Sequence, residues 1–437
     1  MKYFIVTHGC QMNEHDSERI AAILEERGDR PADHIEEADL ILFNTCLVRQ
    51  NAEEKVCGQV GALKKWHREK PGRILGVGGC MMQAGSARET LKKSFPQVDL
   101  VFGTHNIEKL PDFLDEIQKE KKRIFDISEY EGDFPCHFVR PNSFSAYVNI
   151  MTGCNNYCSY CIVPYARGRE KSLPPDFILD QIENLVKEGY QELMLLGQNV
   201  NSYGKDFDYP FPLLLEDIAK IQGLKRIRFM SSHPMDLSDR LIKTMADHPN
   251  IERHFHLPLQ SGSDKVLEEM NRRYTREKFL SLVDKLRDTM PEITITTDII
   301  VGFPGESEKD HQETLDLCQR VRFDNAFTFL YSPRPGTRAA KRADQVPPEV
   351  ASRRFQELTE TLYPIFYEKN QAMVGKRVEV LFDTVSKRAE NKISGRDSGA
   401  RLIHVPGEKD LVGKFRTVKI SSANSFALQG VIEDLIL

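Results

Sequence analysis

The stretch Gly153-Cys154-Asn155-Asn156-Tyr157-Cys158-Ser159-Tyr160-Cys161 places three cysteines on one short segment with the spacing CxxxCxxC. It follows an apolar run, residues 146–151, whose length and composition predict a strand. Three thiolates on a strand-end loop suit three irons of a 4Fe–4S cube, and the fourth iron stays open for chemistry. The alternative is a structural zinc site, but zinc usually takes four ligands in two pairs, and no second pair follows here.

This cysteine spacing resembles the signature of radical S-adenosylmethionine (SAM) enzymes. The resemblance implies that the open iron chelates the amino and carboxylate groups of SAM, and that an electron from the cluster cleaves SAM to methionine and a 5′-deoxyadenosyl radical. Residues 137–370 agree with it, because they repeat strand and helix about six times and predict an incomplete parallel (β/α)6 barrel. The expected strands are residues 146–151, 192–197, 226–230, 253–257, 294–301 and 326–331.

Three predicted loops at the carboxyl-terminal mouth of this barrel join glycine to polar side chains, which suits a backbone that approaches a polar ligand closely. They are Gly197-Gln198-Asn199, residues 256–262 with Gln260 and Ser261, and Gly302-Phe303-Pro304-Gly305-Glu306. By resemblance, the first stands where radical-SAM enzymes contact the methionyl amine, often as Gly-Gly-Glu. Gln260 and Ser261 are expected at the ribose or the substrate. We therefore predict that Gly197, Gln198, Asn199, Gln260, Ser261, Gly302 and Glu306 bind the cofactor.

Residues 1–136 alternate strand and helix patterns, which predicts an open parallel α/β sheet. Three predicted strands, residues 3–7, 40–43 and 74–77, are each followed closely by a cysteine: Cys10, Cys46 and Cys80. Ligands collect outside the carboxyl ends of such strands, so these cysteines should converge in space. The alternative is three buried structural cysteines, but those should not all fall at strand ends, two of them beside glycine. We predict a second 4Fe–4S cluster with one open iron.

A tri-cysteine N-terminal domain joined to a radical-SAM core resembles the methylthiotransferase family, on the motifs His8-Gly9-Cys10-Gln11-Met12-Asn13 and Asn44-Thr45-Cys46. Residues 11–14, 51–56 and 197–204 look like the branch that acts on isopentenyladenosine in tRNA. The resemblance implies that one SAM methylates a sulfur carried on the N-terminal cluster. A second SAM is cleaved at the Cys154, Cys158 and Cys161 cluster, and a methylthio group replaces a hydrogen of adenine. The cofactors carry the hard chemistry, and the protein binds and orients.

Residues 371–437 carry 11 Lys+Arg against 8 Asp+Glu, whereas residues 1–136 carry 19 against 24. Five predicted strands and no helical period indicate a small β-barrel, which resembles the RNA-binding TRAM domain. Its cations are expected to contact phosphates of a tRNA anticodon stem-loop without reading sequence. The alternative, a solvated barrel surface, stays open because the excess charge is small.

The 437-residue chain has no secretory signal at its N-terminus and no apolar run long enough for a membrane span, which predicts a cytoplasmic protein. In a reducing compartment its 9 cysteines are expected to serve metals and not disulfides. We also expect a monomer. An external electron donor and a sulfur source are expected but not identified by any motif. Of the other three cysteines, Cys57 and Cys318 fit apolar helix faces, and Cys136 lies in a predicted linker without a role.

Two arginines, Arg167 and Arg169, follow the CxxxCxxC segment. We expect them either to meet a carboxylate or phosphate or to lie on a solvated face.

Rival functions remain at this point. A sister enzyme would modify threonylcarbamoyladenosine or an aspartate of a ribosomal protein, and an RNA-binding iron–sulfur redox sensor would not need the SAM loops. An isopentenyl group needs an apolar pocket, for which Leu257, Leu259, Phe303 and Pro304 are the predicted walls. A threonylcarbamoyl group carries a carboxylate, which such a pocket would penalise by desolvation.

Overall fold

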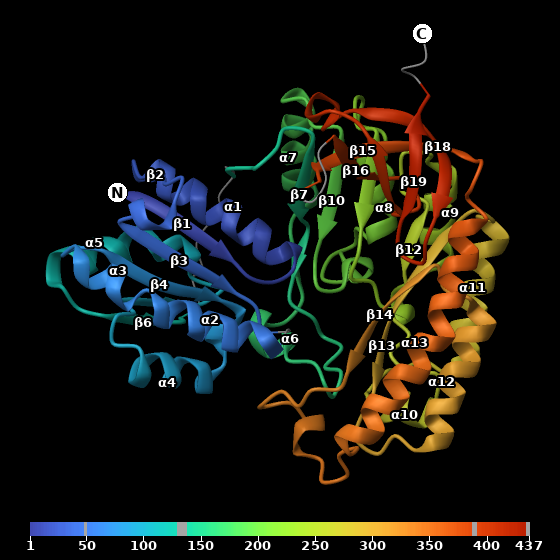
Figure 1. The fold of residues 1–437 in the computed structure, drawn as a ribbon, viewed down its shortest axis with the longest axis horizontal. Coiled ribbons are helices and arrows are strands. Elements are labelled where there is room, and N and C mark those ends of the chain that lie inside the picture. Colours follow the sequence, from blue (N-terminus) through green and yellow to red (C-terminus); the bar gives the residue numbers. More distant parts are fainter. Residues whose placement is uncertain (48–49, 129–137, 387–390, 434–437) are drawn as a thin grey trace. The chain divides into compact units, whose positions relative to one another are not determined.

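The computed structural model describes residues 1–47, 50–128, 138–386 and 391–433 (Figure 1). The chain forms two compact units. The first comprises Met1–Pro141, Thr152–Asn155 and Cys161–Lys171, and the second comprises Asn142–Met151, Asn156–Tyr160 and Ser172–Leu437. Within the described residues, none of the helices combines the length and the apolar composition that a membrane crossing requires.

The first unit is built on a six-stranded, wholly parallel sheet, as the alternation of strand and helix patterns predicts. β3 and β4 are buried along their whole length because hydrophobic clusters cover both faces of the sheet. In sheet order the strands are β2 (Arg30–Pro31), β1 (Lys2–Thr7), β3 (Leu40–Thr45), β4 (Ile74–Gly79), β5 (Leu100–Phe102) and β6 (Ile124–Asp126). The helices are α1 (Gln11–Glu26), α2 (Gln50–Ala62), α3 (Lys64–Glu69), α4 (Gly85–Ser94), α5 (Leu110–Glu120), α6 (Val163–Arg167), η1 (Ile35–Glu37), η2 (Cys80–Gln83) and η3 (Ile107–Lys109).

The second unit begins with six strands whose described pairings are all parallel. They form two sheets, β11-β10-β7 and β12-β13-β14, which a single parallel bridge between Ile227 and Ile251 connects. β7 and β14 do not pair with each other within the described residues, so the predicted incomplete barrel is confirmed. The strands are β7 (Ser145–Asn149), β10 (Glu192–Leu196), β11 (Arg226–Phe229), β12 (His254–His256), β13 (Thr294–Val301) and β14 (Asn325–Leu330); β8 (Met151–Thr152) and β9 (Lys171–Ser172) form a separate two-stranded sheet.

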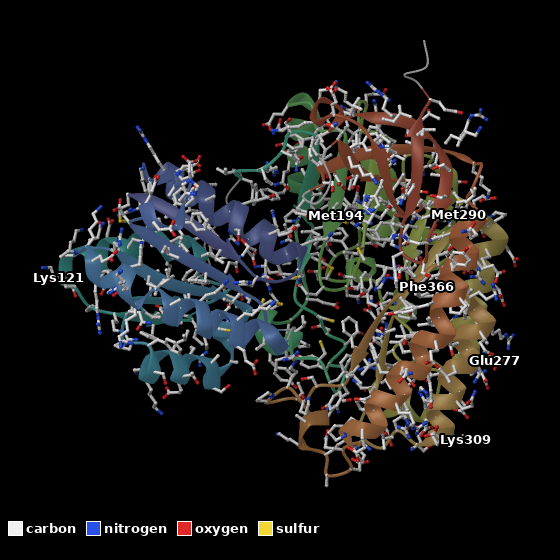
Figure 2. The ribbon with its side chains drawn as sticks, in the orientation of Figure 1. Lys121, Met194, Glu277, Met290, Lys309 and Phe366 are labelled. Atoms are coloured by element: carbon white, nitrogen blue, oxygen red, sulfur yellow. The ribbon has the colours of Figure 1, made fainter. Side chains whose placement is uncertain are left out.

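Helices cover one face of these strands, and Phe366 of α13, labelled in Figure 2, belongs to the hydrophobic core between helices and strands. α7 and α8 begin with proline at their first turn, where a missing N–H does no harm. The helices are α7 (Pro175–Lys187), α8 (Phe211–Ala219), α9 (Asp239–Asp247), α10 (Asp264–Glu269), α11 (Arg276–Thr289), α12 (Glu308–Val321), α13 (Pro348–Gln371), η4 (Val200–Ser202), η5 (Pro234–Asp236) and η6 (Ala339–Lys341).

The last part of the second unit is a closed five-stranded barrel, which confirms the predicted small β-barrel. β15 pairs with both β16 and β18, so the sheet has no free edge. In order around the barrel, the strands are β15 (Arg377–Val385), β16 (Lys392–Arg396), β17 (Leu402–Pro406), β19 (Leu428–Ile432) and β18 (Phe415–Ala423), with η7 (Lys409–Leu411) between β17 and β18.

This closed barrel packs against the amino-terminal ends of the (β/α)6 strands. Arg226, the first residue of β11, donates from Nη1 to the carbonyl oxygen of Arg396 at 2.8 Å, and its guanidinium lies 4.9 Å from the ring centroid of Phe415. The backbone N–H of Arg253, just before β12, donates to Oγ of Ser398 at 3.1 Å. Because the six strands are parallel, their βα loops lie at the other end of the unit, away from the closed barrel.

Candidate functional site

The three cysteines of the first unit lie at the carboxyl ends of three neighbouring strands. β1, β3 and β4 are adjacent in the sheet; Cys10 is the N-cap of α1, Cys46 follows β3, and Cys80 begins η2 after β4. The side chains of Cys46 and Cys10 are hydrogen-bonded, and this contact, with a smaller contribution from the charge of Arg167, lowers the pKa of Cys10 to about 6. Burial raises the pKa of the Cys80 thiol. The predicted convergence of the three cysteines is thus observed.

Two buried asparagines join the cysteine loops of β1 and β3. Asn13 donates from Nδ2 to the carbonyl oxygen of Thr45 at 3.2 Å, and its Oδ1 accepts from the backbone N–H of Cys10 at 3.3 Å. Asn44 donates from Nδ2 to the carbonyl oxygen of Asn13 at 2.8 Å. Both residues stand within motifs that the chain shares with the methylthiotransferase family, and no local pattern predicts these contacts. Their role is positional, because a buried amide must satisfy its donors and acceptors and so fixes the loops around it.

Glycine is required beside two of these cysteines. A Cβ on Gly9 would lie 2.8 Å from Cβ of Cys46 and closer still to the side chain of Asn13. Gly79 has φ +93°, and a Cβ there would lie 2.5 Å from the carbonyl oxygen of Thr45. Both positions demand a residue without a side chain because the backbone loops approach each other so closely.

Arg167, at the end of α6, is buried against this cysteine group. Its Nε donates to Sγ of Cys80 at 3.1 Å, and its Nη2 donates to the carboxylate of Asp16 at 2.6 Å. Of the two outcomes expected for Arg167 and Arg169, the structure gives one to each residue. Arg167 meets a carboxylate and a thiol, whereas Arg169 is exposed.

The CxxxCxxC segment runs through both units, and different contacts hold its parts. In the first unit, the backbone N–H of Cys154 donates to the carbonyl oxygen of Gly168 at 3.2 Å. Gly153, with φ +79°, has no room for a side chain, because a Cβ would lie 2.0 Å from the carbonyl oxygen of Arg169. Cys154 and Cys161 are both partly exposed thiols.

In the second unit, residues 156–160 are held by the chain that follows α10. Ser159 donates from its backbone N–H to the carbonyl oxygen of Met270 at 2.9 Å. Asn271 donates from Nδ2 to the carbonyl oxygens of Asn156 and Tyr157. Cys158 is buried, and Nη1 of Arg272 lies 3.5 Å from its Sγ.

The three glycine-containing loops predicted at the barrel mouth are called the rim loops: Gly197-Gln198-Asn199, residues 256–262 and residues 302–306. The first rim loop holds Asn199 in a buried position. Asn199 donates from Nδ2 to the carboxylate of Asp236 at 2.7 Å. Its Oδ1 is buried and has no hydrogen-bond partner among the described residues. Such an orphaned acceptor is uncommon in a folded protein and is satisfied when a donor binds beside it.

The second rim loop contains a residue with an uncommon backbone conformation. Gln260 has φ +68°, and its backbone joins the edge of β13 through the carbonyl oxygen of Asp298 and the N–H of Ile300. A non-glycine residue in this region is held there by its surroundings, and such residues concentrate at functional sites. Ser261 is fully buried and accepts from the backbone N–H of Ser263 at 3.3 Å.

The third rim loop is held by a buried ion pair. Glu306 accepts from the backbone N–H of Gly302 at 2.8 Å and from Nη1 of Arg354, in α13, at 3.0 Å. Burial raises the pKa of Glu306. The carboxylate therefore already has partners within the chain.

The predicted apolar pocket walls are wrong. Leu257, Leu259 and Phe303 have no exposed surface, and Pro304 is buried as well. Leu257 and Leu259 belong to the large hydrophobic core of the second unit, and Phe303 packs in a separate cluster with Val266, Met270 and Ala339.

The inner face carries exposed aromatic rings instead. The register of β13 and β14 pairs Asp298 with Phe327 and Ile300 with Phe329, so these four share the face opposite the helix-packed Ile299. Phe327 and Phe329, on the edge strand β14, are each 49% exposed. The ring of Phe327 lies 6.0 Å from that of His256. Two half-exposed rings on one inner face form a surface that an unstacked base can contact.

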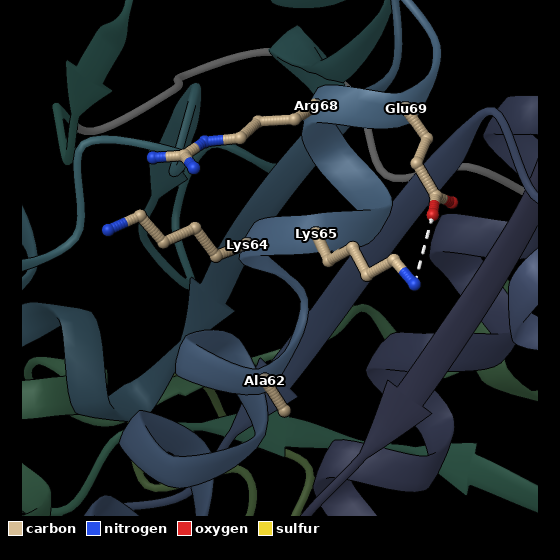
Figure 3. Close-up of a pocket in the computed structure, with 5 residues that line it drawn as sticks. All are labelled: Ala62, Lys64, Lys65, Arg68 and Glu69. Atoms are coloured by element: carbon tan, nitrogen blue, oxygen red, sulfur yellow. Dashed lines mark ion pairs between the residues drawn. The ribbon is translucent and has the colours of Figure 1, made fainter.

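Of the remaining cysteines, Cys318 is buried as expected, whereas Cys57 is only half-buried. Cys136 lies outside the described residues. A shallow hollow of about 430 Å³ on α2 and α3 is lined by cationic side chains, with Lys65 paired to Glu69 at 3.6 Å (Figure 3). It holds none of the cysteines.

No group of three or more His, Cys, Asp or Glu side chains in the described part of the chain surrounds a point that one metal ion would occupy.

Three family models match the chain: "Uncharacterized protein family UPF0004" over residues 2–103, "Radical SAM superfamily" over residues 148–318, and "TRAM domain" over residues 371–432. Curated relatives match nearly the full length. A "tRNA-2-methylthio-N(6)-dimethylallyladenosine synthase" of Clostridium botulinum (strain Okra / Type B1) is 49% identical, covering 98% of this chain and 96% of the relative. One of Finegoldia magna with the same name is 48% identical, covering 99% and 94%.

Solved structures share the fold at low identity. The radical S-adenosylmethionine methyltransferase TsrM from Kitasatospora setae, solved with cobalamin and a 4Fe–4S cluster, superposes with a TM-score of 0.57 at 14% identity, covering 78% of this chain and 77% of that one. The cobalamin-dependent radical enzyme OxsB superposes with a TM-score of 0.54 at 11% identity, covering 83% and 56%.

Proposed function

This chain belongs to the radical-SAM methylthiotransferase family, together with the tRNA-2-methylthio-N(6)-dimethylallyladenosine synthases, and on that premise we propose that it modifies tRNA. The reaction replaces the C2 hydrogen of N6-isopentenyladenosine, next to the anticodon, with a methylthio group and uses two SAM molecules. The observation that carries the proposal is the convergence of Cys10, Cys46 and Cys80 at adjacent strand ends in a chain that also has the CxxxCxxC loop.

Cys10, Cys46 and Cys80 would hold one 4Fe–4S cluster, and Cys154, Cys158 and Cys161 a second. The donor set fits, because none of the six cysteines is part of a disulfide and cationic side chains touch one sulfur in each set. When bound, the clusters supply electron transfer to SAM and a carrier for the sulfur that is transferred. Asn13 and Asn44 hold the first set of thiols in place, and residues 269–272 hold the middle of the CxxxCxxC loop.

SAM would lie at the rim loops, where Asn199 provides the best-supported contact. Its Oδ1 is buried without a hydrogen-bond partner among the described residues and would accept from an ammonium donor such as the methionyl amine. Gly197, Gln198 and Gln260 are predicted to line the same rim. Ser261, Gly302 and Glu306 are already bonded within the chain, so we propose that they support the rim's shape around the cofactor.

The isopentenyl group would contact the inner rings of Phe327 and Phe329. A base inside a helical stack is out of reach, so the target must be unstacked and turned in, which single-stranded loops allow at least cost. Half-exposed phenylalanines favour a branched apolar group. Asp298 lies beside Phe327 in register and would repel the carboxylate of a threonylcarbamoyl group.

The closed C-terminal barrel would hold the RNA through phosphates. It lies at the amino-terminal ends of the strands, whereas the rim lies at their carboxyl ends. A strand as long as β13 spans about 26 Å at ~3.3 Å per residue. The RNA must therefore extend along the unit, which an anticodon stem-loop can do and a single nucleotide cannot.

Three synthetic anticodon stem-loops test the proposal, carrying isopentenyladenosine, threonylcarbamoyladenosine or adenosine at the same position. Incubation with reconstituted, reduced protein, SAM and sulfide should give methylthio product, measured by nucleoside mass spectrometry, only on the first. Comparable product on the threonylcarbamoyl RNA would refute the substrate assignment. Absence of 5′-deoxyadenosine with every RNA would favour the redox-sensor alternative over an enzyme.

A further inference from the structure

We propose that Arg167 is a positioning residue that tunes the N-terminal cluster through its hydrogen bond to Cys80. The inference rests on the proposed function, because it assumes that Cys80 binds iron. It goes further because Arg167 follows the CxxxCxxC segment in sequence, yet we assign it a role at the other, sulfur-carrying cluster.

The contact is specific and shielded from water. Arg167 reaches Cys80 across 87 positions of the sequence, with Nε 3.1 Å from Sγ. The side chains of Arg167 and Asp16 are each 7% exposed. The ion pair with Asp16, at 2.6 Å, engages Nη2 and leaves Nε directed at the sulfur. The guanidinium is thus held in one orientation by two partners.

The backbone around Arg167 is held as well. The carbonyl oxygen of the preceding Ala166 accepts from Oγ1 of Thr104 at 3.0 Å. α6 begins two residues after Cys161 and ends at Arg167, and all of these residues belong to the first unit. The arginine therefore connects Cys80 to the segment that carries Cys161 by a short, well-bonded path.

An arginine in this position has a predictable electrostatic effect. Guanidinium stays charged at any working pH, and its N–H donors are directed by a rigid plane. Hydrogen bonds to the sulfurs and the local net charge set the reduction potential of an iron–sulfur cluster. Because reduction adds negative charge to the cluster, a cationic donor favours the reduced form and raises the potential. Asp16 partly offsets the charge while it orients the donor.

The test uses the full chain with Cys154, Cys158 and Cys161 changed to alanine, so that only the N-terminal cluster contributes to the spectrum. Into this parent we would introduce Arg167→Gln, Arg167→Lys, Asp16→Asn and, as the control, Arg169→Gln on the exposed neighbour. After reconstitution, iron content and the midpoint potential from a titration followed by electron paramagnetic resonance are measured for each.

We expect about four irons per chain in the parent. Arg167→Gln should shift the midpoint to more negative potential, Arg167→Lys should shift it less, and Asp16→Asn should shift it to more positive potential. Arg169→Gln should leave it unchanged. If Arg167→Gln does not fold or bind iron, the shifts of Arg167→Lys and Asp16→Asn decide.

Unchanged midpoints in iron-loaded Arg167 and Asp16 variants would overturn the inference and leave a purely structural ion pair. Failure of the proposed function gives a different result, because a parent without iron would show that Cys10, Cys46 and Cys80 hold no cluster. That result would remove the inference together with the cluster assignment.

Discussion

The carboxylate of Glu306 lies 3.0 Å from Nη1 of Arg354, and the two side chains are 2% and 5% exposed. This pair ties the third rim loop to α13. Removing one partner of a buried ion pair leaves an uncompensated charge, which costs about 3–5 kcal/mol. Arg354→Ala should therefore lower the free energy of unfolding by that amount, measured by urea denaturation of the cluster-free protein.

The neighbouring Arg353 is the matched control for Arg354. It lies on the same helix and pairs with Glu308 and Glu357, but it is 49% exposed. Exposed ion pairs contribute little, so Arg353→Ala should leave unfolding nearly unchanged. Equal losses in the two variants would contradict a special role for the buried pair.

The second prediction concerns metal content. The wild-type chain should bind about eight irons after reconstitution, and the variant with Cys10, Cys46 and Cys80 changed to alanine about four. That variant should still cleave SAM to 5′-deoxyadenosine but should form no methylthio product. Cys318→Ala should keep the full iron content, because this thiol is buried in a hydrophobic cluster. Full iron in the triple variant would show that the second cluster is misassigned.

The third prediction concerns the inner rings of β14. Phe327→Ala and Phe329→Ala should each lower kcat/KM for the isopentenyladenosine RNA by roughly 5- to 30-fold, the equivalent of about 1–2 kcal/mol of apolar contact. The two substitutions should have little effect on the affinity for an RNA that lacks the isopentenyl group. Tyr367→Ala is the control, since this ring is also 49% exposed but lies on α13. Equal losses with Tyr367→Ala would exclude a specific pocket.

The fourth prediction concerns RNA binding by the closed barrel. Its removal is an unsuitable test, because Arg226 and Phe415 contact each other across its base. Charge reversal of the exposed Lys409, Lys414 and Lys419 avoids this problem. Fewer phosphate contacts should weaken tRNA binding and flatten its dependence on salt, while SAM cleavage without tRNA is retained. As the control, charge reversal of Lys187, exposed on α7, should change neither the affinity for tRNA nor its dependence on salt. Unchanged tRNA affinity in the barrel variant would show that the RNA is recognised elsewhere.

Local patterns identified most of the architecture. The short apolar runs predicted the central strands of both parallel sheets, and the loss of helical periodicity after residue 373 predicted the closed barrel. These predictions succeed because strand and helix have different side-chain periods, which a short window of sequence reveals. The strand-end positions of Cys10, Cys46 and Cys80 predicted their convergence for a different reason, because the carboxyl ends of parallel strands lie at one edge of the sheet.

Side-chain partners across the fold could not be found that way. Arg167 and Arg169 are two residues apart and chemically identical, yet one is buried on Cys80 and the other is exposed. Leu257 and Phe303 were predicted as pocket walls, but both are fully buried in hydrophobic clusters, whereas Phe327 on the edge strand is half-exposed. The sequence by itself determined which elements form and where the cysteines stand along them. Only the tertiary structure decided which side chains meet, because register and packing bring together residues that are far apart in the chain.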